Sequence, residues 1–423
     1  MKRLKILKRK KGRFLSRVIT AFMAAGLWTA MSLTAQTPVT INVGSIYTGG
    51  TSNNSGSSSE SQWDANHVSG QTFLNLKSAN GNYTLTGTNA NITVRVQNAA
   101  TDAKITFDDL NIESDMNNAP FVAYASSSAT TLTLTLTGNS YLTAIMGGSG
   151  VGAFVVGTNI DCTVTGNGSL TATSRTEGAI YLSGSNLNIT GTVTVNAIGP
   201  STSPSGPRGV LVSSANSSHI DVGTGVTLNA TGYNGIESRT DLTLNINGIL
   251  NATSNATFNN PEGISMWSGK NLTLRGSGSI TVTGKEAAIY TYGIPSILMD
   301  DRVTLSITNG FTYSWDTETH TFEAFNPSST AEWQLTGATT TDPLTNAVIN
   351  VSVAAGQTGT IKRVGGVKPG DINGDDAVNG ADMNILLTNF GKSGPAVNPA
   401  ADLNSDDAVN GADMNILLTN FGK

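Results

Sequence analysis

The sequence predicts an all-β fold, a right-handed parallel β-helix with three short strands per coil, followed by a small all-α module at the C-terminus. The chain of 423 residues contains 47 Gly, and only 13% of its residues are charged. Short apolar alternations separated by Gly and Asn favour strands over amphipathic helices. In the middle of the chain these alternations return at a loose period, and the last 53 residues hold one 22-residue segment written twice.

The N-terminus indicates export. Nine Lys and Arg residues lie within the first 17 positions, an apolar run follows over residues 18–30, and small residues surround Ala35. This arrangement is typical of a secretory signal peptide over residues 1–35, and the run is shorter than the ~20 residues of a membrane-spanning helix. We therefore expect a secreted protein, extracellular or in a cell-surface assembly, without a membrane span in the mature chain. Residues 36–65, rich in Ser, Gly and Asn, are expected to form a flexible lead.

Charge and cysteine content restrict the possible partners. Nine of the 24 basic residues lie in the predicted signal peptide, so 15 basic residues face 29 acidic ones in the mature chain, a net charge of −14. Such an acidic protein is unsuited to binding nucleic acid. The single cysteine, Cys162, cannot form an internal disulfide. Calcium and strand stacking, rather than cross-links, then have to hold the exported chain together.

Two sequence markers recur through the middle of the chain and define the repeat. The first is an apolar-x-Ala step, and the second is a small residue that opens an apolar triplet. A further short alternating strand lies between them, which gives three strands per repeat. The first marker occurs at Leu142-Thr-Ala144, Leu170-Thr-Ala172, Val195-Asn-Ala197, Leu228-Asn-Ala230 and Leu250-Asn-Ala252. The second marker begins at Gly152, Gly178, Gly209, Gly235, Gly263 and Ala287.

One coil of this size cannot bury its own inner face, so we expect roughly ten stacked coils over residues 66–310. Inward Val, Ile, Leu and Ala would form one continuous core, and the longer repeats would carry corner insertions such as residues 200–207. An array of β-sandwiches is the competing fold, but it predicts repeats of about 100 residues and hairpins with Asn-Gly turns. Residues 311–364, with Trp315 and Trp333, are expected to cap the open end, and residues 365–369 to form a linker.

The repeats resemble a known family. Residues 81–87, 91–96 and 104–114, together with the Glu-Gly-Ile corner at Glu262, are similar to a family of secreted, calcium-dependent carbohydrate-binding proteins with a pectate-lyase-like β-helix. The resemblance covers roughly residues 64–310. It implies a polysaccharide-binding β-helix whose acidic corner residues hold calcium.

Acidic and aromatic residues recur at or next to the second marker, and they define a candidate site along one edge of the β-helix. Glu177, Glu262 and Glu286 lie immediately before a marker and Glu237 lies inside one, so successive coils would bring their carboxylates together. Stacked like charges favour a bridging cation, which suggests calcium or glycan binding at this edge. The aromatic residues either form an exposed strip that stacks on sugar rings or cover the coil edge. They are Tyr181, Trp267, Tyr290 and Tyr292.

Catalysis is the alternative to binding, because β-helices of this kind include polysaccharide lyases and polygalacturonases. The Gly-His-Gly turn of galacturonan hydrolases with this fold is absent from the sequence. A lyase needs a basic group beside metal-binding carboxylates. Arg239 near Glu237 and Lys285 near Glu286 offer this arrangement, although both also fit surface charge pairs. The cluster that begins at Asp300 fits a turn, and no catalytic residue is assigned.

The duplicated C-terminal segment has the ligand spacing of a calcium loop. Oxygen-bearing side chains occupy loop positions 1, 3, 5, 9 and 12, and a backbone carbonyl occupies position 7, a pattern that wraps six to eight oxygens around Ca²⁺ at about 2.3–2.6 Å. Apolar residues after each loop are spaced for one side of a helix. The predicted ligands are Asp371, Asn373, Asp375, Ala377, Asn379 and Asp382, then Asp402, Asn404, Asp406, Ala408, Asn410 and Asp413. The apolar residues are Ile385, Leu386 and Phe390, then Ile416, Leu417 and Phe421.

A loop followed by one helix, duplicated within residues 370–423, resembles the type I dockerin, the module that binds cohesin domains. At loop position 6, Asp376 and Asp407 replace the usual Gly, and Asp is among the few residues that tolerate the backbone conformation of that turn. The resemblance implies a cohesin partner and places the cohesin-facing residues at loop positions 10 and 11. The competing interpretation is a calcium-stapled cap without a partner. The cohesin-facing residues are Gly380, Ala381, Gly411 and Ala412.

Together these patterns predict a secreted, non-catalytic polysaccharide-binding β-helix, anchored through a calcium-loaded dockerin to a cohesin-bearing scaffold. The first alternative is a β-helix polysaccharide lyase or glycoside hydrolase with the same attachment. The second is a surface structural protein or adhesin. The expected cofactor is Ca²⁺, with two ions in the dockerin and further ions on the β-helix if the edge glutamates bind them.

Overall fold

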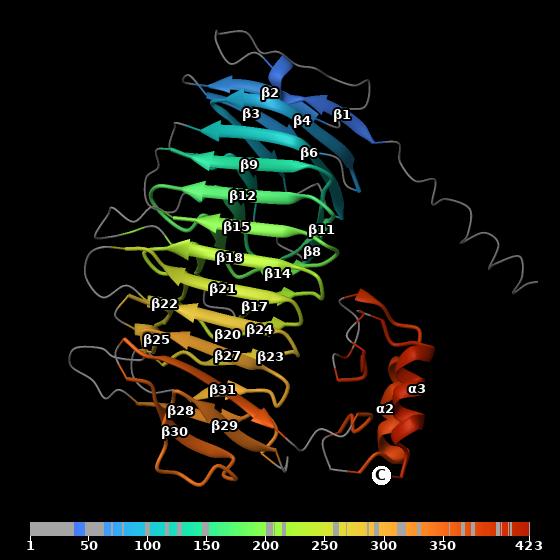
Figure 1. Ribbon diagram of the computed structural model, residues 1–423. Helices are drawn as coiled ribbons and strands as arrows, with labels where there is room; N and C mark the ends of the chain where they lie inside the picture. The colour runs from blue at the N-terminus through green and yellow to red at the C-terminus, as the bar shows by residue number, and fades with distance from the viewer. Residues whose placement is uncertain are drawn as a thin grey trace, which may run out of the picture. The chain divides into compact units, whose positions relative to one another are not determined.

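The computed structural model describes residues 38–46, 63–68, 71–77, 80–97, 102–114, 118–124, 129–145, 152–199, 206, 208–213, 217–256, 262–267, 269–285, 287–291, 296–310, 319–327, 331–354, 356–364, 369–373, 377–394, 398, 400–404, 406 and 408–422. The predicted signal peptide and most of the predicted lead lie outside these residues. The described part is mostly β, a β-solenoid of about seven turns, with two short α-helices near the C-terminus (Figure 1). The predicted β-helix with a small helical segment after it is confirmed.

From β8 (Thr130–Leu136) onwards, successive turns of the solenoid contribute one strand to each of three parallel ladders, and the third ladder begins earlier with β5 (Ile92–Val96) and β7 (Phe121–Ala123). The first ladder contains β8, β11 (Ile160–Gly166), β14 (Asn186–Ile189), β17 (Ser218–Val222), β20 (Leu242–Ile246), β23 (Leu272–Arg275) and β26 (Ile297–Met299). The second contains β9 (Asn139–Ala144), β12 (Ser169–Ser174), β15 (Thr194–Ile198), β18 (Thr227–Gly232), β21 (Ile249–Ser254), β24 (Ser279–Thr283) and β27 (Thr304–Thr308). The third contains β5, β7, β10 (Phe154–Val156), β13 (Ile180–Leu182), β16 (Val210–Val212), β19 (Ile236–Ser238), β22 (Glu262–Met266) and β25 (Ala287–Thr291).

Longer strands build the first turns. β4 (Asn82–Ala90) pairs in parallel with β6 (Ala103–Ser114), and β6 is long enough to pair with both β8 and β9. β1 (Val39–Asn42) lies against β4 and is followed by the short 3-10 helix η1 (Val43–Ser45). Because these turns and the turns with corner insertions use more residues than the shortest repeat, the solenoid has about seven turns instead of the ten expected.

Antiparallel pairings occur at both ends of the solenoid. At one end, β2 (Trp63–Val68) pairs with β3 (Gln71–Leu76), which continues the third ladder into β5. At the other end, a parallel strand beside β26 is followed by three strands in antiparallel pairings. This change of direction ends the run of parallel pairing that an open edge would continue. The strands at this second end are β28 (Thr319–Ala324), β29 (Glu332–Thr336), β30 (Val348–Ser352) and β31 (Thr358–Val364).

Trp333 and Arg363 hold the last strands together. The Trp333 ring is 1% exposed and meets Phe322 edge to face, with 6.2 Å between ring centroids. Arg363 lies over the same ring, 4.9 Å from its centroid, and its Nε pairs with Asp301 Oδ1 at 2.6 Å. Burial lowers the pKa of Arg363, and the neighbouring Asp301 carboxylate opposes that shift. Trp315, in the same predicted capping segment, lies outside the described residues.

The strand register explains the loose sequence period. Leu228 of β18 faces Val195 of β15 on one side and Leu250 of β21 on the other. The first of these steps covers 33 residues and the second covers 22 residues, as the neighbouring pairs Asn196–Asn229 and Asn229–Asn251 also show. Inward side chains therefore stay aligned, and the corners absorb the difference in length.

One copy of the first marker departs from this register. The marker is aligned in β12, β15, β18 and β21, but Leu142 of β9 faces Ala172 of β12. That first copy is displaced by two positions along its strand. It is therefore not equivalent to the others.

Two copies of the second marker, at Gly209 and Gly235, open with a glycine that is required where the second and third ladders meet. A Cβ added at Gly235 would lie 2.5 Å from the backbone nitrogen of Thr253 and 2.7 Å from the carbonyl oxygen of Gly263. No side chain fits between backbones at these distances, so only a residue without a Cβ permits the approach. The glycine is thus a packing requirement of this corner at Gly235. In the register of the third ladder, the equivalent residues of other coils are Ala153, Ala179 and Ala288, so the second marker is not in one phase throughout and its glycine is not required in every coil.

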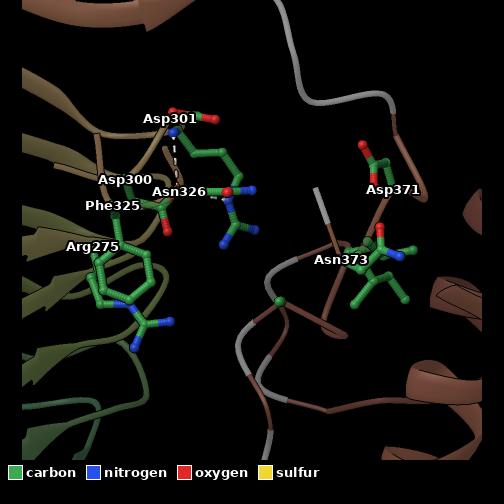
Figure 2. A pocket seen from close by; sticks show the side chains of 11 residues that line it. Arg275, Asp300, Asp301, Phe325, Asn326, Asp371 and Asn373 are labelled. Carbon is green, nitrogen blue, oxygen red and sulfur yellow. Dashed lines mark hydrogen bonds and ion pairs between the residues drawn. The ribbon is translucent and has the colours of Figure 1, made fainter. Parts of the chain in front are cut away.

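A turn follows β26, and two short helices lie near the C-terminus. The Asp300 cluster forms the predicted turn, in which Val303 N donates to Asp300 O at 3.2 Å. One coil earlier, Arg275 at the end of β23 lies over the ring of Phe325, 4.5 Å from the ring centroid (Figure 2). The helices are α2 (Gly380–Asn389) and α3 (Gly411–Asn420). Among the described residues, no helix has the length and apolar character needed to cross a membrane.

Cys162 provides a probe of the solenoid core. It points inward from β11 and is completely buried, and burial raises the pKa of its thiol to about 12. Because the thiolate is the reactive form and an unfolded cysteine titrates near 8.5, iodoacetamide at pH 8 should modify the native thiol roughly a thousandfold more slowly than the thiol in urea. The raised pKa also means that this group lowers stability as pH rises from about 8.5 towards 12. Thr163→Cys, which points outward from the same strand, is the control and should react in the native protein.

Candidate functional site

The C-terminal loops gather acidic side chains at the start of each helix. In the second loop, carboxylate oxygens of Asp402, Asp406 and Asp413 all lie within 4.8 Å of one another. Asp402 and Asp413 are buried, whereas Asp406 is exposed. Like charges at this separation favour a bridging cation, and a set of oxygen donors suits a hard ion such as Ca²⁺. The residues therefore fit the metal that the sequence pattern predicts.

Backbone hydrogen bonds fix the aspartate at loop position 12. Asp413 Oδ1 accepts from Leu403 N at 2.7 Å and from Asn404 N at 3.2 Å, and Oδ2 accepts from Asn410 N at 2.8 Å. Asn410 caps the first turn of α3 in return, so the two residues form a capping box. The buried carboxylate is thus held between the loop and the helix that follows it.

The two asparagines predicted as ligands of the second loop already contact its acidic cluster. Asn404 Nδ2 donates to Asp406 Oδ2 at 2.9 Å, and Asn410 Nδ2 approaches the same oxygen at 3.4 Å. The carbonyl oxygen of Ala408 accepts from Asn410 Nδ2 at 3.5 Å. A cation at this position would bind the Oδ1 atom of each asparagine, whereas without it the Nδ2 atoms face the carboxylate. A rotation of each amide group therefore allows the same side chains to serve the loop with and without the cation.

The first loop repeats this arrangement. Asp382 is completely buried, and its Oδ1 accepts from the backbone nitrogen of Asn373 at 3.0 Å while its Oδ2 accepts from that of Asn379 at 2.8 Å. Asn379 Nδ2 donates to the carbonyl oxygen of Ala377 at 3.1 Å. Figure 2 shows the side chains of Asp371 and Asn373 in this loop. The remaining predicted ligand, Asp375, lies outside the described residues.

The two copies brace each other through reciprocal backbone hydrogen bonds. Gly391 N, after α2, donates to Val409 O at 2.8 Å, and Gly422 N, after α3, donates to Val378 O at 2.7 Å. Val378 and Val409 follow the position 7 carbonyl in each loop. A small apolar core lies between the copies. Its buried residues are Ile372, Val378, Leu386, Ala401, Val409 and Leu417.

The sequence pattern placed Phe390 and Phe421 on the same side of each helix as the buried leucines, and this prediction is wrong. Leu386 is buried as predicted and Ile385 is half-buried, but Phe390 caps the end of α2 and is 49% exposed. Its copy in α3 is exposed to a similar extent. The helix is too short to carry this position onto the buried side, because its last helical residue precedes the phenylalanine. Leu387 is also 54% exposed, and sequence periodicity alone did not single it out.

The predicted cohesin-facing residues all lie on exposed surface. Gly380 and Ala381 open α2, and their copies Gly411 and Ala412 open α3. Gly380 and Leu387 are seven residues apart and therefore share one side of the helix. Space around Gly380 is open, since a Cβ added there meets nothing within 4 Å.

A second cluster lies on the outward face of the third ladder, around the carboxylate of Glu237. Glu237 is 4% exposed, yet it points away from the core in β19. Its Oε2 accepts from Arg208 Nε at 2.6 Å and from Asn234 Nδ2 at 3.2 Å. Its Oε1 accepts from Arg239 Nε at 3.3 Å and from Trp267 Nε1 at 3.2 Å. Four donors from three coils therefore satisfy one buried carboxylate.

Trp267 is the exposed member of this cluster. It follows β22, its side chain is 51% exposed, and the Arg239 guanidinium lies 4.8 Å from the ring centroid. The hydrogen bond to Glu237 and the contact with Arg239 hold the indole in one orientation. One face of the ring is thereby supported by protein, and an aromatic surface remains accessible beside arginine and carboxylate groups.

The other predicted edge residues have different surroundings. Glu177 is near Arg208, with 3.9 Å between a carboxylate oxygen and a guanidinium nitrogen. Glu262 is buried, 5% exposed, and its backbone nitrogen donates to Asn234 Oδ1 at 3.1 Å. Tyr181 and Tyr290 are half-exposed in the outward column that contains Glu237. The remaining two, Glu286 and Tyr292, lie outside the described residues.

Sequence reasoning missed Arg208 and Asn234. Both precede strands of the third ladder, at the position that Glu262 occupies one coil after Asn234 and two coils after Arg208, and both bind Glu237. The insertion at residues 200–207 hides the alignment of Arg208 with the repeat. A comparison of the residue before each second marker would have found them. The arginines neutralise Glu237, so the predicted stack of bare carboxylates is an alternation of acid and base at this point.

No protein-family model, curated protein or solved structure matches the chain.

Proposed function

We propose that the protein is a secreted polysaccharide-binding β-solenoid that does not cleave its ligand, and that its C-terminal module is a calcium-loaded dockerin bound by a cohesin. The observation that carries the binding proposal is Trp267, an exposed indole held in place by a buried carboxylate and an arginine. Aromatic rings fixed in this way stack on the apolar faces of sugar rings, while nearby charged groups accept and donate to hydroxyls.

The charge of the cluster supports a neutral or weakly acidic sugar. Arg208 and Arg239 are both engaged by Glu237, and Glu177 adds a second carboxylate beside Arg208. Neither arginine therefore offers an unpaired positive charge to an anionic ligand. Hydroxyl groups, which both donate and accept, suit such a mixed surface better than a carboxylate does.

Binding without cleavage is favoured over a lyase because of how Arg239 is used. A lyase base has to take a proton from the carbon beside a uronate carboxylate. Arg239 instead donates through Nε to Glu237 and packs against Trp267. The other basic candidate, Lys285, is exposed, and its acidic neighbour lies outside the described residues. A lyase with the same attachment is the second candidate, and a surface adhesin without glycan specificity is the third.

Three features support the attachment proposal. Both loops hold their position 12 aspartate in the same buried arrangement, and the second loop brings three carboxylates together. The two copies present the same exposed residues, Gly380 with Leu387 and Gly411 with Leu418. Exposed apolar residues repeated on two helices favour a protein partner. Either copy could then occupy the same cohesin surface.

Trp267→Ala is the test of glycan binding. Loss of the stacking surface should weaken binding to soluble oligosaccharides at least tenfold, since aromatic contacts contribute about 1 kcal/mol or more beyond buried area. The measurement is a glycan array followed by titration calorimetry on the best ligand. Tyr124→Ala is the matched control, because Tyr124 is also exposed on the third ladder with an arginine near its ring. It should leave the affinity unchanged.

A product assay on the same ligand separates the candidates. Release of reducing ends or 4,5-unsaturated uronate by the pure protein, abolished by Arg239→Ala or Lys285→Ala, would replace the binding proposal with the lyase. An array without any glycan signal would favour the adhesin.

A further inference from the structure

The outward surface of the second ladder carries no charge over seven successive strands, β9, β12, β15, β18, β21, β24 and β27, all of which the structure describes. These strands run side by side in Figure 1. Alternate side chains point outward, and nearly all of the outward ones are Thr, Asn or Ser, as in Thr227, Asn229 and Thr231 of β18. We name the outward residues of these seven strands the Thr/Asn face.

The absence of charge is specific to this side of the solenoid. On the first ladder the outward positions include Asp161, Asp221 and Arg275. On the third ladder the outward positions include Glu237 of β19, and Arg239 lies just beyond the end of that strand. Outward positions on the same coils therefore accept charged residues, and the coil architecture does not exclude them from the second ladder.

Hydrogen bonds between coils order the centre of the Thr/Asn face. Asn251 Nδ2 donates to Asn229 Oδ1 at 2.8 Å, Asn229 Nδ2 donates to Asn196 Oδ1 at 2.9 Å, and Asn196 Nδ2 donates to Thr171 Oγ1 at 3.3 Å. Each amide uses one of its two N–H groups in this row. The second N–H groups form a series of donors that repeats at the strand spacing of about 4.8 Å.

Apolar side chains interrupt the polar rows. Tyr141, Ile198 and Ile249 are 46%, 37% and 46% exposed and lie on β9, β15 and β21. Strands carry exposed apolar residues singly without special cause, but here they share a face with the ordered amides. The face thus combines regular hydrogen-bonding groups with apolar contacts, as a carbohydrate surface also does.

We propose that the Thr/Asn face binds the flat surface of an ordered, neutral polysaccharide, in which parallel chains are packed into an insoluble particle. Docking an uncharged face requires no ion to be desolvated. Rows of identical groups at a constant spacing can engage a repeating array of hydroxyls at many points, and many weak contacts give a firm attachment. The face is an outward sheet surface rather than a groove, so it suits a particle surface better than a single soluble chain. This inference rests on the proposed polysaccharide binding but uses other residues than Trp267.

The simpler interpretation is that Thr is a favoured surface residue of strands and that Asn rows stabilise stacked strands. Under that interpretation the face binds nothing, and an added charge has no effect on binding. The two interpretations differ in a measurable result.

The test uses the full mature chain in calcium and measures its depletion onto microcrystalline cellulose and onto crystalline chitin. The double variant Thr227→Lys with Thr281→Lys places two charges on the Thr/Asn face, and we expect at least tenfold weaker binding to the solid that the wild type prefers. The matched control is Thr163→Lys with Thr243→Lys, which makes the same change at half-exposed outward positions of the first ladder. It should bind within twofold of the wild type.

The outcomes separate this inference from the proposed function. A wild type that binds neither solid, or a folded double variant that binds as well as the wild type, overturns the inference. If the double variant does not fold, the single variant Thr283→Lys at the edge of the face replaces it and should weaken binding several-fold. Loss of soluble binding in Trp267→Ala with unchanged particle binding supports two separate sites. If Trp267→Ala loses particle binding and the double variant keeps it, both activities belong to Trp267 and the inference is overturned.

Discussion

Removal of calcium from the full chain is expected to unfold the C-terminal module while the solenoid stays folded. In the described part of the module, the core contains six buried apolar residues, which is too few to stabilise a segment of this size without a further constraint. At a free calcium concentration a thousandfold above Kd, one bound ion contributes about 4 kcal/mol, comparable with the whole stability of so small a unit. Hydrogen exchange measured by mass spectrometry should show rapid exchange in α2 and α3 after chelation, with strands such as β18 still protected.

The loop variants make this prediction specific. Asp371→Ala with Asp402→Ala should exchange rapidly even in millimolar calcium and should capture no cohesin from a panel of immobilised cohesins. Asn384→Ala with Asn415→Ala, on exposed helix positions, is the control for calcium-dependent protection. Each single loop variant should keep partial cohesin binding, because both copies present the same surface. Protection of the helices that survives chelation would show that the loops are not metal sites.

Glu237→Ala is expected to cause the largest loss of stability of any single change on the solenoid surface. It removes the shared acceptor of four donors and leaves Arg208, whose side chain is 17% exposed, without its closest partner. Loss of one partner from a buried ion pair costs about 3–5 kcal/mol. Thermal unfolding followed by circular dichroism should therefore show a clear fall in Tm. Soluble glycan binding should fall as well, because the Trp267 indole loses its hydrogen bond.

Two further variants test the cause of that loss. Glu237→Gln keeps one acceptor oxygen and the shape of the side chain, so its Tm should lie between those of the wild type and Glu237→Ala. Asp221→Ala removes a half-exposed acid whose contact with His219 is 3.7 Å long, and exposed pairs contribute about 0–1 kcal/mol. Equal Tm values for Glu237→Ala and Asp221→Ala would mean that the Glu237 network does not stabilise the fold. A stabilising role for calcium at this cluster would instead appear as a lower Tm of the solenoid transition in chelator, separate from the unfolding of the C-terminal module.

The repeat was predictable because each coil meets the same packing requirement. The loose period is reproduced by the two partners of Leu228, and the glycine at Gly235 is explained by the backbone that faces it. The displaced marker at Leu142 and the antiparallel end were not predictable in the same way. Both depend on which strand lies next to them, and short apolar alternations look alike whichever strand they face.

For the candidate sites too, features set by local sequence were predictable and contacts between coils were not. Loop positions in the C-terminal module lie close together in sequence, so local spacing identified Asp402, Asp406 and Asp413 as neighbours. Two of the four partners of Glu237, Arg208 and Trp267, come from 29 residues before it and 30 residues after it. A loop of variable length separates Arg208 from its equivalent in the preceding coil. Contacts of this kind follow only from the register of stacked coils.

The constant register of coils that differ in length has a consequence for how such a protein can evolve. Corner segments can lengthen or shorten while every strand keeps its neighbours, as the unequal steps on the two sides of Leu228 show. Insertions near Arg208 can therefore reshape the cluster around Glu237 without altering the spacing of the Thr/Asn face. Duplication of a whole coil would instead extend that face by one row and leave the local geometry of the corners intact. The ligand selectivity of the Glu237 cluster and the size of the Thr/Asn face can thus change through separate genetic events.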